Sequence, residues 1–304
     1  MKYRGPWLKL ALVFPAALAA ALPLSLSLSA CGDDTSSSGG GGESSSSNAA
    51  SSGGDGGDAS ATTSTDTSSP SSSGSTGAGG DPGPVCTEPT AVPCEDDVIL
   101  QMNLKDDVAP GDIDNTPDGS GFRTTVDASA GGAFAPDPDS FVYGRFTDAG
   151  LEKVEISDEE SLGSMDWDVA FRRYVARVNS GHSGPSCVAA TRLAGTPDFE
   201  TATSAPEGAT FRKDEYFTES CEVIADGTGL PGSPATALSS YWTYPGCVQM
   251  TNYVFVVQLA DGRQVKLIVD AFYDEDAQAQ CQDDDVAPEG NNGSGTIQLR
   301  WAFL

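Results

Sequence analysis

The chain has 304 residues, which is enough for one large domain or two small ones. It carries 44 acidic and 16 basic residues, a formal net charge of −28, and a single histidine. Such a polyanion lacks the basic surface that nucleic acids require, and one histidine excludes zinc sites and acid–base schemes built on several histidines.

The first segment, residues 1–31, has the pattern of a secretory signal. Three cations come first: Lys2, Arg4 and Lys9. An apolar stretch follows over residues 10–28, and two prolines with several serines make it a poor membrane-spanning helix. It ends in Leu28-Ser29-Ala30-Cys31, which resembles the lipobox of bacterial lipoproteins. We therefore expect Cys31 to become a lipidated N-terminus that anchors the protein to the bacterial outer membrane or cell surface.

The second segment, residues 32–85, has the composition of a disordered linker. Residues 32–84 contain 17 serines, 14 glycines, seven acidic residues and no basic residue among 53 positions. A segment without large apolar residues cannot bury enough surface to offset its chain entropy. As a Gly/Ser coil, it would hold its two ends about 40 Å apart on average.

The third segment, residues 86–304, contains nearly all the core-forming residues and predicts one all-β domain of antiparallel sheets, sandwich-like in architecture. Short β-like runs at 141–147 and 151–156 flank the turn 148–150. The last residues, 297–303, alternate between apolar and polar and predict a terminal strand. No stretch of this segment shows a helical apolar stripe.

The strongest hairpin signal is Asp261-Gly262, between the runs 252–260 and 263–273. A two-residue turn there would pair Val256 with Leu267 and would place Val254 opposite Val269. One apolar face would then combine five residues, Val254, Val256, Val265, Leu267 and Val269.

A change of phase marks the run 166–178. Before Arg172-Arg173 the apolar residues have odd numbers, and after it they have even numbers. We interpret this slip as a β-bulge, or as a strand that passes from one layer to another.

Seven cysteines minus Cys31 leave six, an even number for an oxidising compartment. Fifteen pairings are possible, and proximity in sequence favours Cys86–Cys94, Cys187–Cys221 and Cys247–Cys281. The hairpin register gives the last pair additional support. No CxxC spacing occurs, which argues against zinc.

Few residues offer catalytic or ligand chemistry. His182 lies in the segment Gly181-His182-Ser183-Gly184-Pro185, where proline replaces the last glycine of a nucleophile elbow and no second histidine can serve as base. We therefore expect no enzyme, and an exposed loop position is the default interpretation of His182.

Asp112, Asp114 and Asp118 resemble a calcium loop only loosely, and solvated acidic loops are the expectation. For Met250 the default expectation is a place in the core, and the alternative is a role as a soft ligand.

Aromatic residues are numerous enough to line a pocket for a flat ligand, although a β core also requires them. The set comprises Trp167, Phe171, Tyr174, Tyr241, Trp242, Tyr244, Tyr253, Phe255, Phe272, Tyr273 and Trp301. Core packing is the default expectation for them.

Several of these motifs together resemble the HmuY-like lipoproteins over about residues 140–304. They are the run Trp167–Tyr174 with Asn179-Ser180-Gly181, the segments Tyr253–Val257, Asp261–Arg263, Lys266-Leu267 and Phe272-Tyr273, and the closing run Gly295–Phe303. The resemblance implies an all-β fold, a place at the cell surface or outer membrane, and capture of haem through two His or Met side chains.

The single histidine departs from that pattern, because one chain cannot supply two histidine ligands. The resemblance therefore implies His182 with a methionine, Met250 first, as candidate haem ligands. It favours a lipid-anchored extracytoplasmic binding protein with haem or a haem protein as its partner and no other metal. The alternative is a cell-surface interaction or structural lipoprotein without a cofactor. Nucleic acid is not an expected partner of either.

Overall fold

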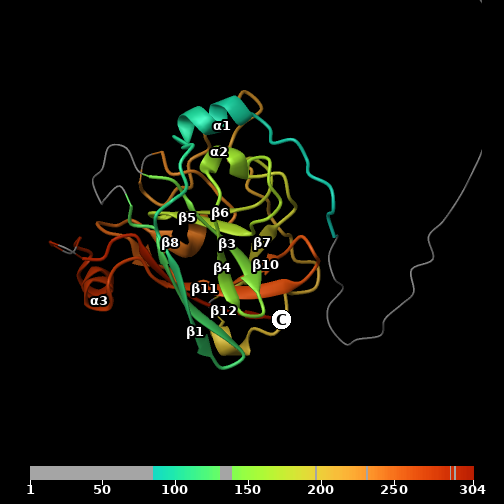
Figure 1. The fold of residues 1–304 in the computed structure, drawn as a ribbon. Coiled ribbons are helices and arrows are strands. Elements are labelled where there is room, and N and C mark those ends of the chain that lie inside the picture. Colours follow the sequence, from blue (N-terminus) through green and yellow to red (C-terminus); the bar gives the residue numbers. More distant parts are fainter. Residues whose placement is uncertain (1–84, 131–138, 196, 231, 288, 291) are drawn as a thin grey trace, which may run out of the picture. The chain divides into compact units, whose positions relative to one another are not determined.

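The computed structural model describes residues 85–130, 139–195, 197–230, 232–287, 289–290 and 292–304 (Figure 1). All of them belong to one unit of the chain, residues 72–304. The predicted signal, Cys31 and most of the predicted linker lie outside the described residues.

Two antiparallel sheets form the domain, as the sequence predicted. The larger sheet has six strands in the order β1 (Ile113–Asp118), β2 (Gly121–Asp127), β12 (Thr296–Phe303), β11 (Gln264–Ala271), β10 (Phe255–Gln258) and β7 (Ala189–Arg192). The smaller has four, in the order β4 (Gly150–Val154), β3 (Val142–Thr147), β5 (Val169–Arg172) and β6 (Val175–Val178). A separate two-stranded ribbon pairs β8 (Trp242–Thr243) with β9 (Gln249–Met250). The predicted strands 141–147, 151–156 and 297–303 are confirmed as β3, β4 and β12.

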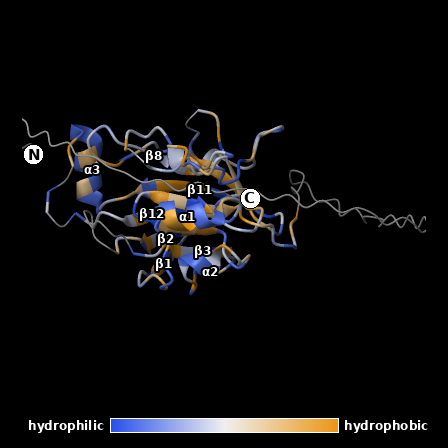
Figure 2. Ribbon diagram, turned by 90° about the horizontal axis from the view of Figure 1, so that it is seen from above, coloured by the Kyte–Doolittle hydropathy of each residue, from blue (hydrophilic) through white to orange (hydrophobic). Residues whose placement is uncertain are grey.

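The main core lies between the inner faces of the two sheets. The six-stranded sheet supplies residues such as Leu267 and Leu299, and the four-stranded sheet supplies Phe171 and Val178. A second cluster covers the other face of the four-stranded sheet, and a third covers the outer face of the six-stranded sheet. Figure 2 shows the apolar residues concentrated on β2, β11 and β12, in contrast to a mainly hydrophilic α3. Burial on both faces explains why β5 and β10 are mostly apolar, whereas the edge strand β1 is mostly exposed and polar.

The β10–β11 hairpin forms, but the predicted register is wrong by one residue. Phe255 pairs with Leu267, and Val257 pairs with Val265. The loop has three residues, 260–262, because the Leu259 N–H donates to the Arg263 carbonyl and the Gly262 N–H donates to the Leu259 carbonyl. Gly262 has a φ of +86°, which suits this longer turn. The slip moves Val254 and Val256 to the outer cluster and leaves Phe255 and Val257 in the main core.

The phase slip at Arg172-Arg173 is a hairpin turn and not a bulge. Arg172 pairs with Val175 across a two-residue turn, so Phe171 lies opposite Ala176. Across a two-residue turn, each odd-numbered residue of β5 pairs with an even-numbered residue of β6, and paired residues point to the same face of the sheet. The change of parity was therefore a correct observation with the wrong interpretation.

The described part of the chain has three α-helices, which the sequence analysis did not predict: α1 (Glu95–Gln101), α2 (Asp158–Ser161) and α3 (Glu275–Asp284). The first two are short, and α3 is mostly polar, so none has a wide apolar stripe. Ser157 begins α2 with a capping box in which Glu160 is the partner. Within the described ranges, no helix has the length and apolarity needed to cross a membrane.

One disulfide agrees with the predicted pairing, and two differ. Cys247 bonds to Cys281 as expected, although Cys281 lies on α3 and not on an extended strand. The other two bonds join Cys86 to Cys187 and Cys94 to Cys221.

The N-terminal arm explains the two wrong pairings. The Cys86 N–H donates to the Ala260 carbonyl, and the Thr90 N–H donates to the Pro185 carbonyl, so the arm lies along the β10–β11 turn and the 185–187 segment. Cys94 then reaches Thr218 and Cys221 at the start of α1. The two bonds close loops of 101 and 127 residues, and loops of that size gain about 4–5 kcal/mol in the chain-entropy account.

Candidate functional site

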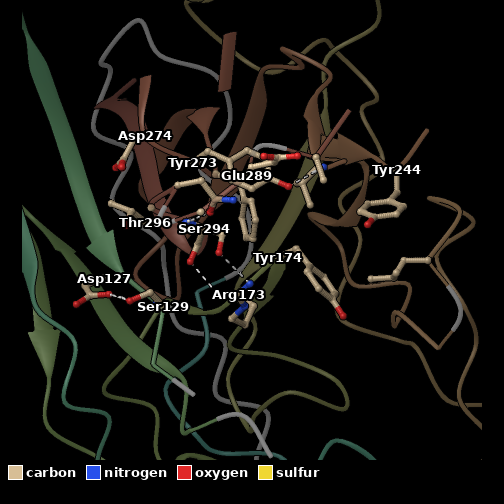
Figure 3. Close-up of a pocket in the computed structure, with 17 residues that line it drawn as sticks. Asp127, Ser129, Arg173, Tyr174, Tyr244, Tyr273, Asp274, Glu289, Ser294 and Thr296 are labelled. Atoms are coloured by element: carbon tan, nitrogen blue, oxygen red, sulfur yellow. Dashed lines mark hydrogen bonds between the residues drawn. The ribbon is translucent and has the colours of Figure 1, made fainter. Parts of the chain in front are cut away.

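The described domain has an open cleft of about 1030 Å³ beside the β5–β6 turn (Figure 3). That volume lies at the upper end of small-molecule sites. The lining residues come from the end of β2, the β5–β6 turn, the segments that follow β11 and precede β12, and the region of the β8–β9 ribbon. They are Asp127, Ser129, Arg173, Tyr174, Leu230, Tyr244, Val248, Phe272, Tyr273, Asp274, Ala287, Glu289, Gly290, Asn292, Gly293, Ser294 and Thr296.

Aromatic rings form a connected wall of this cleft. Tyr174 packs against Trp242 with centroids 5.0 Å apart and lies 6.5 Å from Phe272. Phe272 in turn contacts Tyr273 edge-on at 4.8 Å. The backbone carbonyl of Tyr174 accepts a hydrogen bond of 2.7 Å from the Tyr241 hydroxyl, which holds the turn in place. A flat apolar ligand could stack on this wall.

The charges of the cleft are separated between its rim and its interior. Asp127, Asp274 and Glu289 are exposed, while Arg173 is half-buried. Burial raises the pKa of Tyr174 and of Tyr273 above the ordinary value, so both phenols are neutral at pH 7. The interior is therefore an aromatic surface with one cation.

His182, the first predicted ligand, is not on an exposed loop. The structure buries it to 7% exposure, and its ring packs against Tyr216 and Phe217. Nδ1 accepts hydrogen bonds from the backbone N–H groups of both residues, at 3.1 and 3.3 Å. Burial lowers the pKa of the imidazole, which favours its neutral form. Because Nδ1 accepts hydrogen bonds, that neutral form carries its proton on Nε2. In this arrangement neither nitrogen presents a lone pair to a ligand, and His182 does not line the cleft.

Met250, the second predicted ligand, is a core residue at 4% exposure. Its backbone N–H donates to Oε1 of Gln282, and its carbonyl accepts from Nε2 of the same amide. Met250 belongs to the main core cluster, whereas His182 packs beside residues of the second cluster. The structure thus places the two predicted ligands in different environments, and their role as a haem-ligand pair stays a prediction.

The remaining sequence candidates offer no metal centre. Asp114 and Asp118 lie on β1, so the loosely calcium-like segment is a strand and not a loop. Across the residues that the structure describes, no group of three or more His, Cys, Asp or Glu side chains could hold a metal ion. All six cysteines of the domain are in disulfides.

A second charged cluster, the Arg177 network, lies inside the domain away from the cleft lining. Arg177 is fully buried, donates to the Ser183 hydroxyl and carbonyl at 3.1 and 2.7 Å, and donates to the Tyr143 hydroxyl at 3.2 Å. Ser183 donates to Asp214, and Tyr143 donates to Asp158, at 2.6 and 2.9 Å. Burial opposes the charge of Arg177, but the neighbouring phenols and carboxylates raise its pKa. This network is satisfied internally and leaves no open surface for a ligand.

Comparison with known proteins agrees with the resemblance seen in the sequence. Residues 137–283 match the family model described as HmuY protein. This segment is HmuY-like. No curated protein matches the chain.

Three of the solved structures similar to this chain are bacterial proteins. A Bacteroides vulgatus protein assigned as an HmuY-like heme binding protein is 17% identical, with 60% of this chain and 91% of that chain covered and a TM-score of 0.38. A Bacteroides fragilis protein assigned as a lipoprotein is 14% identical, with coverages of 62% and 91% and a TM-score of 0.39. The apo HmuY analog of Tannerella forsythia is 17% identical, with coverages of 65% and 98% and a TM-score of 0.34.

Sequence analysis missed which aromatic residues of the HmuY-like domain face the cleft. Tyr174, Tyr244 and Tyr273 had been assigned to the core by default, and only the fold brings them to one wall. One local signal was available. Arg173 occupies the first position of a two-residue turn with a φ of +55°, where glycine or asparagine is usual.

Proposed function

We propose that this protein is a lipid-anchored extracytoplasmic binding protein whose HmuY-like domain takes a flat, amphipathic ligand into the cleft, with haem as the candidate. The family match supports a binding role. The aromatic wall formed by Tyr174, Phe272 and Tyr273 is the single observation that carries the choice of site.

The donor chemistry of the cleft fits haem through oxygen. None of the described lining residues is histidine, methionine or cysteine, whereas three are tyrosines, Tyr174, Tyr244 and Tyr273. A tyrosine side chain is an established axial ligand of haem. Haem in this cleft would supply an iron centre whose absorption spectrum reports its ligand, and the aromatic wall would exclude water from one face of the ring.

Titration of the full chain with hemin tests the proposal. We expect a Soret band that saturates at one equivalent and a dissociation constant clearly below that of a generic carrier protein measured in parallel. Tyr174→Phe, Tyr244→Phe and Tyr273→Phe identify the ligand, because loss of the phenol that binds iron should change the ferric spectrum while its neighbours leave it unchanged. Binding no tighter than to the carrier would favour the alternative, a surface interaction lipoprotein without a cofactor.

The pH dependence of binding separates tyrosine from the predicted pair of His182 and Met250. A neutral phenol must lose its proton to bind ferric iron, so hemin affinity should rise by up to tenfold per pH unit between pH 6 and 8. Burial lowers the pKa of the His182 imidazole below its ordinary value of 6.5, so a histidine ligand would gain little from a rise in pH above 7, and affinity should then stay nearly flat. Under the histidine hypothesis His182→Ala weakens hemin binding at least tenfold, and Met250→Ala alters the reduced spectrum.

The lipid anchor is a separate part of the proposal. The run Leu28-Ser29-Ala30-Cys31 supports it, and the Ser/Gly linker would hold the domain clear of the membrane. Cys31→Ser should abolish lipidation and release the protein from membranes. A substituted protein that stays on the membrane after removal of its signal would contradict the anchor and leave the binding proposal intact.

A further inference from the structure

Arg173 stands apart from the other cations of this acidic chain. Six others form ion pairs with carboxylates: Arg123, Arg145, Lys153, Arg172, Arg263 and Arg300. No carboxylate of the described residues lies within ion-pair distance of Arg173, although the chain has 44 acidic residues. Arg192, Arg212 and Lys213 also have no ion pair among the described residues, but they are exposed to solvent. Arg177 and Lys266 lack one too but are enclosed by protein groups, whereas Arg173 is half-buried and opens into the cleft.

The Arg173 guanidinium is held in a defined position. Nη1 donates to the Ser294 carbonyl at 2.8 Å, and Nη2 donates to the Ser294 hydroxyl at 3.3 Å (Figure 3). The group lies 5.5 Å from the centroid of the Phe272 ring. Gly295 permits this approach, because a Cβ there would lie 3.1 Å from Nη1.

Part of the hydrogen-bonding capacity of Arg173 remains available. A guanidinium has five N–H groups, and the two bonds to Ser294 use two of them. The three carboxylates of the cleft lie on its exposed rim, and none is near enough to pair with this group. A half-buried cation without a counter-ion is unfavourable, so the arrangement suits a site that an anion completes.

The backbone supports the same interpretation. Arg173 has a φ of +55°, a left-handed conformation that costs a non-glycine residue of order 1 kcal/mol or more. Its N–H donates to the Ala128 carbonyl at 3.0 Å, which fixes the turn to the end of β2. The turn thus has a non-glycine residue in a strained left-handed conformation, at the position from which the guanidinium enters the cleft.

We infer that Arg173 is a carboxylate-recognition point, and that the ligand of the cleft carries a carboxylate on a flat apolar body. This inference rests on the proposed binding function and specifies the chemical class of the ligand. The body would lie on the Phe272–Tyr273 wall, and its carboxylate would pair with the free N–H groups of Arg173.

A matched pair of metal-free porphyrins tests the inference without any contribution from iron. Protoporphyrin IX has two carboxylates, and its dimethyl ester has none but retains the same ring. We expect the full chain, in detergent buffer that keeps both porphyrins monomeric, to bind the diacid at least tenfold more tightly than the ester, a difference of about 1.4 kcal/mol. Quenching of tryptophan fluorescence measures both affinities.

Three variants identify the residue. Arg173→Gln should remove the preference for the diacid and leave the affinity for the ester unchanged. Arg173→Lys keeps the charge but not the planar fork, and should retain part of the preference. Arg212→Gln, at an exposed position outside the cleft, is the control and should behave like the wild type. Thermal melting of each variant verifies that it is folded.

The possible failures are distinguishable. Equal binding of diacid and ester by the wild type, or an undiminished preference in a folded Arg173→Gln variant, would overturn the inference and leave the binding function standing. If neither porphyrin binds but hemin does, the inference fails and the proposed function stands. If hemin does not bind either, the proposed function fails as well.

Discussion

Arg173 and Arg177 stand four residues apart around the β5–β6 hairpin, and the structure gives them opposite surroundings. Arg177 is fully buried, and phenols, hydroxyls and two carboxylates compensate its charge. Arg173 is half-buried, its guanidinium donates only to Ser294, and it faces an open cleft without a carboxylate partner among the described residues. A compensated buried charge contributes to the fold, whereas an uncompensated one beside a cavity is available for a ligand.

The largest effect should come from removing the compensated charge. Arg177→Met keeps much of the side-chain volume but leaves Asp158 and Asp214 buried without their cation. We expect the free energy of unfolding to fall by about 3–5 kcal/mol. Urea denaturation measures the change, and Lys213→Met, at an exposed position, is the control with an expected change below about 0.5 kcal/mol. A loss below 1 kcal/mol for Arg177→Met would contradict the contrast between the two arginines.

The buried carboxyl groups around Arg177 should give the free energy of unfolding a pH dependence, an effect of intermediate size. Burial raises the pKa of Asp214 from 3.8 to about 6, although hydrogen bonds from Ala237, Ser183 and Val178 and the charge of Arg177 oppose the shift. A carboxyl with a raised pKa in the folded state stabilises the protein below its unfolded pKa, and that contribution is lost as the pH rises through about 6. Wild-type stability should therefore decrease between pH 4 and pH 6.

Removal of Arg177 should raise the pKa of Asp214 further. Because protonated Asp214 needs no cation, the destabilisation by Arg177→Met should shrink by about 1 kcal/mol or more between pH 7 and pH 4. Asp158 also has a raised pKa and should add to the effect in the same direction. Urea denaturation across this pH range measures the difference, and a constant penalty would show that packing and not charge accounts for the loss.

The smallest effect on stability should come from the cleft arginine. Arg173→Gly relieves the left-handed φ of the turn but loses two hydrogen bonds to Ser294. These contributions are each about 1 kcal/mol and opposite in sign, so the free energy of unfolding should change by less than about 1 kcal/mol. Thermal melting of this variant beside Arg177→Met makes the comparison directly. A loss of 3 kcal/mol or more would show that Arg173 is structural.

Much of the architecture was predictable because local patterns carried it. The hairpin β3–β4 and the terminal strand β12 were evident from alternation and turn residues. The helices were not, because α1 and α2 are short and α3 has only Gln278 and Cys281 buried. The HmuY-like resemblance was equally visible, because its motifs are contiguous in the chain.

The β10–β11 register and two of the disulfide pairings could not be predicted from the hydrophobic pattern. One additional residue in the β10–β11 turn moved Val254 and Val256 to the opposite face of the sheet. Two disulfides joined residues more than 100 positions apart, because the N-terminal arm follows a segment distant in sequence.

The sequence by itself determined the all-β class of the domain and its resemblance to HmuY, and it predicts a signal-like leader with a lipobox and a polar linker. Composition, periodicity and short motifs are local properties, so the chain order alone reveals them. Tertiary structure decided which side chains are available for chemistry. It buried His182 against Tyr216, placed Met250 in the core, and left Arg173 facing an aromatic cleft. Burial and charge compensation depend on contacts between distant segments, and no local pattern specifies those contacts.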